Sequence, residues 1–252
     1  MAQIDYDQVA TVYDTDRAVA LHTQEPWRAA LADYLPPASG LPVLDLGAGT
    51  GLFAAAIAHW FDTNVIAVEP SEGMRQAAHT RRADPRVAYV GGVGERLPLH
   101  DGCCDSAWLS TVIHHLDDPG AAAGELRRVL RPGGWVLIRS AFPDRVEPAT
   151  RVEFWPGTRA LLARFPSSQH TIAMFTAAGF SLQRLERVTD LLASSLRDYW
   201  ERARVRADSL LRQLPDEEFA EGLRRLERAA AAETTPTPMF RPLDLLVLQA
   251  PA

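Results

Sequence analysis

Val43-Leu44-Asp45-Leu46-Gly47-Ala48-Gly49-Thr50-Gly51 is the stretch that decides the fold of this chain. Its first four residues form a short, mainly apolar run, as expected of a strand buried in a parallel sheet. Three glycines at alternate positions follow, and a helical pattern begins at Leu52. A strand, a glycine turn and a helix in this order bring backbone N–H groups and a helix N-terminus close to a ligand. The stretch therefore predicts a nucleotide-type binding site.

The glycine spacing indicates which nucleotide. A dinucleotide fingerprint, G-x-G-x-x-G, would need a third glycine where this chain has Leu52. The chain instead has G-x-G-x-G after an acid, and this resembles motif I of the class I S-adenosylmethionine-dependent methyltransferases, in their small-molecule (ubiquinone/menaquinone-methyltransferase-like) branch. The resemblance implies an α/β fold with a Rossmann-like, doubly wound, seven-stranded and mostly parallel sheet. It also implies that S-adenosylmethionine binds without a metal, leaves as S-adenosylhomocysteine, and contacts Asp45, Gly47, Ala48, Gly49 and Gly51.

Further patterns of that family follow in order. A second apolar run, Val65 to Val68, ends in Glu69, which lies 22 residues after Gly47 and matches the acid that binds the ribose hydroxyls. The alternative is a solvated acid at a strand end. The resemblance adds five cofactor-binding candidates. Pro70 lies beside the acid, Ser110 ends the fourth strand, and three lie near the adenine: Met74, Gly94 and Glu95. Val93 departs from the pattern, because the family commonly has an adenine-binding Asp there.

Two adjacent histidines follow Ser110. His114-His115-Leu116 matches the family's "H-H-L" at the end of the fourth strand, where ligands of doubly wound sheets bind. An imidazole there can act as a base or orient the acceptor by a hydrogen bond. The family also carries the pair for structural reasons, and the pattern does not choose between the two histidines.

The chain is expected to form one methyltransferase domain over residues 1–252. Its parts are a helical lid (1–36), a Rossmann-like core (41–188), a helical insertion or cap (190–234) and a last strand (243–249). The lid resembles the family's "A-x-x-Y-D" segment, which implies that Tyr13 lies at the cofactor and Arg17 near the acceptor, although a helix on the sheet edge is the alternative. In the insertion, helical spacing from Leu192 to Leu214 predicts one helix that Pro215 ends. Aromatic side chains provide the remaining acceptor-pocket candidates or else belong to the core: Trp27, Trp155 and Trp200.

Composition and net charge limit the classes of partner and the kinds of chemistry that this protein can have. The 252 residues carry a net charge of −6, which argues against a nucleic-acid surface, and no apolar run is long enough for a membrane span. All 26 basic residues are arginines, so lysine bases and Schiff bases are excluded. Cys103 and Cys104 are neighbours that cannot form an ordinary structural disulfide, which favours a reducing cytoplasm. High Ala and Arg without Lys is typical of GC-rich bacteria, where such enzymes often modify secondary metabolites.

The sequence thus predicts an enzyme, a transferase that methylates O, N or C of a small molecule by in-line displacement, with a candidate histidine base. It acts as a monomer or homodimer. One alternative is a cofactor-binding relative without methyl transfer, either a regulator or a catalyst of cyclisation. A nucleic-acid methyltransferase is less favoured, because Ser110-Thr111-Val112-Ile113 lacks the Pro-Pro-aromatic motif of enzymes that act on exocyclic amines.

Overall fold

The computed structural model describes residues 25–35, 40–145 and 150–252. The chain folds around one seven-stranded sheet, whose strands are β1 (Val43–Leu46), β2 (Val65–Val68), β3 (Val87–Val90), β4 (Cys104–Ser110), β5 (Leu130–Ser140), β6 (Ser181–Ala193) and β7 (Met239–Gln249). Their order across the sheet is β3-β2-β1-β4-β5-β7-β6, and only β7 runs antiparallel to its neighbours. The mostly parallel seven-stranded sheet implied by the family resemblance is confirmed.

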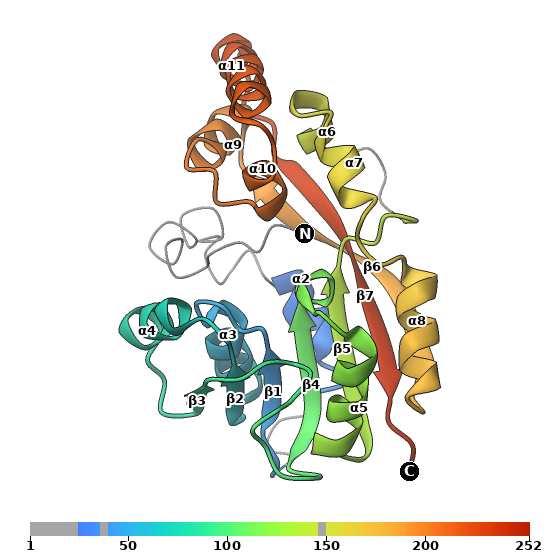
Figure 1. The fold of residues 1–252 in the computed structure, drawn as a ribbon. Helices are drawn as coiled ribbons and strands as arrows, with labels where there is room; N and C mark the ends of the chain where they lie inside the picture. The colour runs from blue at the N-terminus through green and yellow to red at the C-terminus, as the bar shows by residue number, and fades with distance from the viewer. Residues whose placement is uncertain (1–24, 36–39, 146–149) are drawn as a thin grey trace.

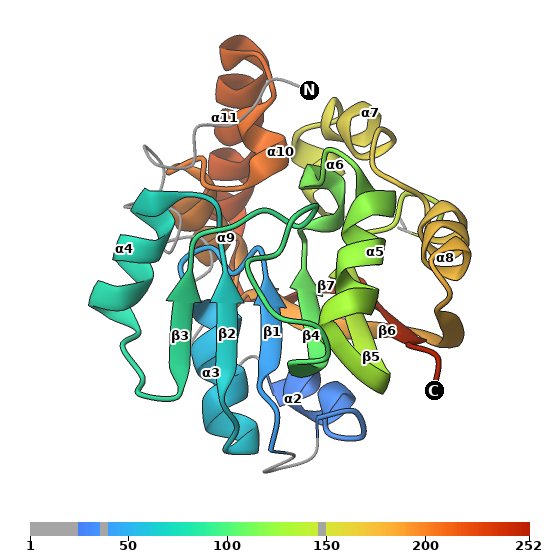
Figure 2. The ribbon, with the colours of Figure 1, turned by 60° about the horizontal axis from the view of Figure 1, so that its bottom comes forward.

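Helices cover both faces of the sheet. On one face lie α2 (Glu25–Leu31) and α3 (Leu52–Phe61), and on the other lie α5 (Pro119–Val129) and α8 (Ser168–Ala177). All four residues of β1 are buried, because this strand lies in the middle of the sheet with helices on both sides. The helix α4 (Glu72–Arg81) lies beside β3 at the sheet edge (Figure 2). Its N-cap is Ser71, whose hydroxyl accepts a hydrogen bond from the Met74 amide.

Five helices form a cap beyond the carboxyl ends of the parallel strands (Figure 1). They are α6 (Thr150–Phe154), α7 (Thr158–Leu162), α9 (Leu196–Ala203), α10 (Ser209–Arg212) and α11 (Asp216–Ala232). The cap has a core of its own, in which Trp155 stacks on Phe219. Gly222 is needed there, because a Cβ at this position would lie 2.1 Å from Nε1 of Trp155.

The predicted start of the insertion was wrong. Residues 190–193 belong to β6, where Leu191 pairs with Phe240 and Ala193 with Met239. The apolar spacing from Leu192 onward is not one helix either, since α9 ends at Ala203 and Arg206 has a φ of +50° before α10 begins. Strand pairing overrode the local helical periodicity at the first of these places.

The N-terminal part of the chain is described only from Glu25. Trp27 and Leu31, on α2, are fully buried against the sheet. The proposed lid residues 1–24 lie outside the described residues, so the lid stays a prediction.

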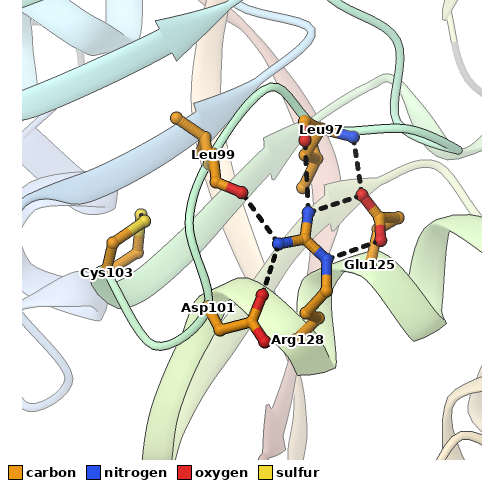
Figure 3. Close-up of polar contacts among 7 residues, drawn as sticks. Leu97, Leu99, Asp101, Cys103, Glu125 and Arg128 are labelled. Carbon is orange, nitrogen blue, oxygen red and sulfur yellow. Dashed lines mark hydrogen bonds and ion pairs between the residues drawn. The ribbon is translucent and has the colours of Figure 1, made fainter.

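The connection between β3 and β4 is a loop that an arginine side chain binds to α5. The segment 91–103 contains no helix, and Arg128 of α5 contacts it with three of the five hydrogen bonds that its side chain donates (Figure 3). Its guanidinium donates to the carbonyl oxygens of Leu97 and Leu99, to Asp101 Oδ1 and to both carboxylate oxygens of Glu125, at 2.7–3.2 Å. Because all five N–H groups are used, this loop is tied firmly to α5.

Arg128→Gln is expected to lower the free energy of unfolding by roughly 1–3 kcal/mol, because it leaves Glu125 Oε1 and the carbonyl oxygens of Leu97 and Leu99 without their donor. Chemical denaturation of the purified variant measures the loss. Arg127→Gln is the matched control, since the adjacent Arg127 side chain is exposed on the same helix. Equal stability of the two variants would contradict the role assigned to Arg128.

Candidate functional site

The turn after β1 has a backbone that only glycine adopts easily. Gly47, Gly49 and Gly51 have φ values of +70°, +55° and +77°. Space is also short: a Cβ at Gly47 would lie 2.4 Å from Cγ2 of Val112, and one at Gly51 would lie 2.2 Å from the hydroxyl of Tyr89. The turn leads directly into α3, so the backbone amides of the turn and of the first helical turn gather at one end of β1.

Asp45 is a buried acid beside this turn. Its side chain is 1% exposed, and its Oδ2 atom has no hydrogen-bond partner among the described residues. Burial, together with the nearby charge of Glu69, raises the pKa of Asp45 to about 8. A buried carboxyl with an unsatisfied oxygen is costly for a folded chain, so this site suits a cationic ligand group that would satisfy it.

Glu69 follows β2 and is bound to the same turn. Its Oε2 accepts a hydrogen bond from the amide of Gly49, and its Oε1 accepts one from the amide of Ser71, both at 2.9 Å. The acid is 7% exposed and therefore is not a solvated side chain at a strand end. It links the turn after β1 to the start of α4.

A cavity of about 170 Å³ extends from the glycine turn to the cap. At the turn it is lined by Asp45, Gly47, Ala48, Gly49 and Thr50, and at the end of β4 by Ser110, Thr111 and His114. Thr111 has a φ of +57°, a strained value for a β-branched residue and one that is commonest at functional sites. The far end is mainly apolar, with side chains from the cap, from the segment after α7 and from β6: Leu162, Ala203, Leu210 and Leu211, then Phe165, then Leu192.

The structure separates the two histidines. His114 is buried, lines the cavity and stacks on the ring of Phe165, with centroids 3.8 Å apart and planes at 10°. His115 is exposed, packs against His114 and does not line the cavity. Of the two candidate bases, only His114 faces the space where an acceptor would lie.

The other predicted cofactor residues surround the turn without lining this cavity. Met74 is buried on α4, while Pro70 is exposed. At Gly94, a Cβ would lie 2.7 Å from Cδ2 of Leu116. Glu95 accepts hydrogen bonds from the amides of Asp117 and Asp118, so its carboxylate joins the loop between β3 and β4 to the segment after the histidines.

The predicted acceptor-pocket tryptophans do not line the cavity. Trp27 and Trp155 are fully buried, and Trp200 packs within the cap beneath Arg197 and Arg204. Trp27 lies directly behind the cavity wall, because its Nε1 donates to Asp190. Tyr13 and Arg17 lie outside the described residues.

A group of charged residues that the sequence reasoning missed lines the cavity wall. We call it the arginine–aspartate cluster: Arg139, Arg151, Arg241, Asp190 and Asp208. Arg139 and Arg241 both bind Asp190, at 2.9 and 3.2 Å, and Arg151 binds Asp208 at 2.5 Å. Burial alone would raise the pKa of Asp190, but the charges of Arg241 and Arg139 outweigh it and lower the pKa to about 2.

One signal for this cluster was present in the sequence. Arg139 directly follows the buried run Trp135 to Ile138, where a charged side chain is unusual unless it is paired. Its partner Asp190 lies 51 residues away in sequence and had been assigned to the helical insertion. Nothing local indicated that the two would meet.

Among the described helices, none has an apolar stretch of the length that a bilayer span requires. No three His, Cys, Asp or Glu side chains within the described ranges gather as potential metal ligands.

Comparison with known proteins agrees with this geometry. The family model described as "Methyltransferase domain" matches residues 44–138. A demethylmenaquinone methyltransferase of Parafrankia sp. (strain EAN1pec) is 31% identical over 205 residues, covering 62% of this chain and 80% of the relative. One from Clavibacter sepedonicus is 35% identical over 135 residues, covering 53% of this chain; the match thus spans about half, 55%, of that relative's length.

A solved structure resembles the whole fold. It is titled a putative methyltransferase from an antibiotic biosynthesis pathway of Anabaena variabilis ATCC 29413. The identity is 22% and the TM-score 0.70, with 88% of this chain and 95% of that chain covered. At this identity the likeness shows the fold alone.

Proposed function

Because the chain belongs to the class I S-adenosylmethionine-dependent methyltransferases, we propose that it binds S-adenosylmethionine at the glycine turn and transfers the methyl group to a small molecule. The observation that carries this proposal is the single cavity that joins the turn to the cap. It offers a cofactor end and an acceptor end that meet near His114. The acceptor atom is an O, N or C; the relatives' printed name, demethylmenaquinone methyltransferase, describes their acceptor and not the acceptor of this chain.

The residues at the turn fit the cofactor. The buried Oδ2 of Asp45 matches a positively charged group, and S-adenosylmethionine carries both a sulfonium and an ammonium. We assign to Glu69 the ribose hydroxyls, since a carboxylate oxygen that accepts one backbone N–H can accept a further hydrogen bond. We assign the adenine side to the exposed Val93, whose side chain offers apolar surface there, whereas Met74 is buried.

Positioning is the main contribution we assign to this chain. When bound, the cofactor supplies a methyl group on sulfonium; the acceptor–carbon bond forms as the carbon–sulfur bond breaks, and the acceptor proton goes to a base. The cavity walls hold the acceptor against the turn and exclude water. Orientation of this kind accounts for up to about 7–11 kcal/mol of the barrier in favourable cases. His114 is the base that we propose where the acceptor must lose a proton.

Calorimetric titration tests cofactor binding. S-adenosylmethionine and S-adenosylhomocysteine should bind, whereas NAD should not. Glu69→Gln should weaken both by roughly tenfold to a hundredfold, because a charged acceptor of hydrogen bonds is lost. Glu72→Gln, on an exposed acid in the first turn of α4, is the matched control and should bind normally. No binding by the native protein would refute the proposal; binding without transfer of a labelled methyl group to any acceptor would favour a regulator or cyclisation catalyst.

The raised pKa of Asp45 predicts a pH dependence. With a pKa of about 8, this carboxyl is mostly protonated at neutral pH before the cofactor binds. A cationic ligand favours the ionised form, so affinity for S-adenosylmethionine should rise with pH, by up to about tenfold per unit, until pH 8 and then level off. Asp45→Asn cannot ionise and should lose this rise. The same slope in native protein and variant would show that another group titrates.

The histidines form a matched pair for kinetics. Once labelled methyl transfer identifies an acceptor, His114→Gln should lower kcat by about a hundredfold or more if that acceptor loses a proton in the reaction. His115→Gln should retain most activity, because His115 is exposed and does not line the cavity. Full turnover by His114→Gln at every pH would remove the base assignment.

A further inference from the structure

The acceptor end of the cavity is apolar except for one charged group, the arginine–aspartate cluster. Its members come from strands β5, β6 and β7 and from the cap, and they meet where the cap joins the sheet. Arg139 and Arg241 share Asp190. Burial raises the pKa of Asp208, whereas the charge of Arg151 lowers it. Arg241 lies close enough to Asp208 for its charge to lower this pKa as well, by a smaller amount. The five charges therefore alternate along one wall.

Arg139 is held rigidly in this wall. Its guanidinium donates to Asp190 and to the hydroxyl of Ser110, and it lies 4.9 Å and 5.4 Å above the ring centroids of Trp27 and Phe53. Aromatic faces stabilise a buried cation and also fix the plane of its guanidinium. Such a group is preorganised to bind a planar anion, because little side-chain entropy remains to be lost.

The wall carries charges of both signs. Among the described lining residues beyond the glycine turn, these are three guanidinium groups and two carboxylates. Guanidinium groups in a mainly apolar wall favour an anionic ligand over a neutral one, and the two neighbouring aspartates oppose a second negative charge on that ligand. Guanidinium groups match the carboxylate geometry in particular, since they offer parallel N–H donors. The remaining wall, with Phe165, Leu192, Leu210 and Leu211, suits an apolar body.

We propose that the acceptor is an amphipathic carboxylic acid, whose carboxylate binds Arg139 and Arg241 beside Asp190 and whose apolar body lies against the cap. This inference rests on the proposed function, because it places the acid at the acceptor end of the same cavity. It deepens that function by naming the substrate class.

Matched acids and amides test the proposal. Calorimetry on the full chain saturated with S-adenosylhomocysteine compares octanoate with octanamide and cinnamate with cinnamamide. Each pair has nearly the same shape but differs in charge. At least one acid should bind about tenfold more tightly than its amide, as expected for a charged hydrogen-bonded pair. Octyl phosphate has the same alkyl chain with a more highly charged headgroup, and it should bind less tightly than octanoate.

Two arginine variants locate the effect. Arg241→Gln should bring the acid-to-amide affinity ratio close to one. Arg145→Gln is the matched control, because Arg145 also binds a buried aspartate, Asp244, and its side chain is 32% exposed against 34% for Arg241, yet it does not line the cavity. Thermal melting of both variants, and their affinity for S-adenosylhomocysteine, verify that each remains folded.

The outcomes separate this inference from the proposed function. Failure of the native protein to bind S-adenosylhomocysteine would refute the proposed function. If S-adenosylhomocysteine binds normally but neither acid binds, or acids and amides bind equally, only the inference that the acceptor is a carboxylic acid would be overturned. A preference that survives Arg241→Gln, or tighter binding of octyl phosphate than of octanoate, would overturn it as well.

Discussion

The left-handed backbone of the glycine turn after β1 is the constraint on which the site depends. Positive φ values at Gly47, Gly49 and Gly51 turn the chain sharply from the central strand into α3. The turn is then surrounded closely: Val112 and Tyr89 fill the space a Cβ would need, and Glu69 accepts the amide of Gly49. These contacts come from β3 and from the segments after β2 and β4, so residues from four neighbouring strands or the segments after them meet at this one local conformation.

Burial at this edge of the sheet produces two different electrostatic environments. Asp45, without a cationic partner among the described residues and next to Glu69, is held towards its neutral form. Asp190, between two arginines, is held ionised. Both acids are buried, so the neighbouring charges decide the difference. The end of the cavity at the glycine turn thus favours a ligand cation, and the end at the arginine–aspartate cluster is where we propose that an acid binds.

The long antiparallel pair β6 and β7 connects the sheet to the cap. Each strand continues past the carboxyl ends of the parallel strands, as Figure 1 shows, and carries one member of the arginine–aspartate cluster: Asp190 on β6 and Arg241 on β7. These two residues are paired in register, so their ion pair joins partners that the ladder already places together. Because a buried ion pair costs desolvation, such a pair is better explained by positioning than by stability.

The sequence by itself determined the central strands and the glycine turn, and it predicted where the cofactor binds, because these depend on residues close together along the chain. Glycine spacing, apolar runs and an acid at a strand end are local signals. Only the tertiary structure decided which histidine faces the cavity, that residues 190–193 extend a strand, and that Arg139, Asp190 and Arg241 meet. Those outcomes depend on contacts between segments about fifty residues apart, which local periodicity does not record. The tryptophans show the same limit, since their positions in the chain gave no indication that packing would place Trp27 and Trp155 in the core.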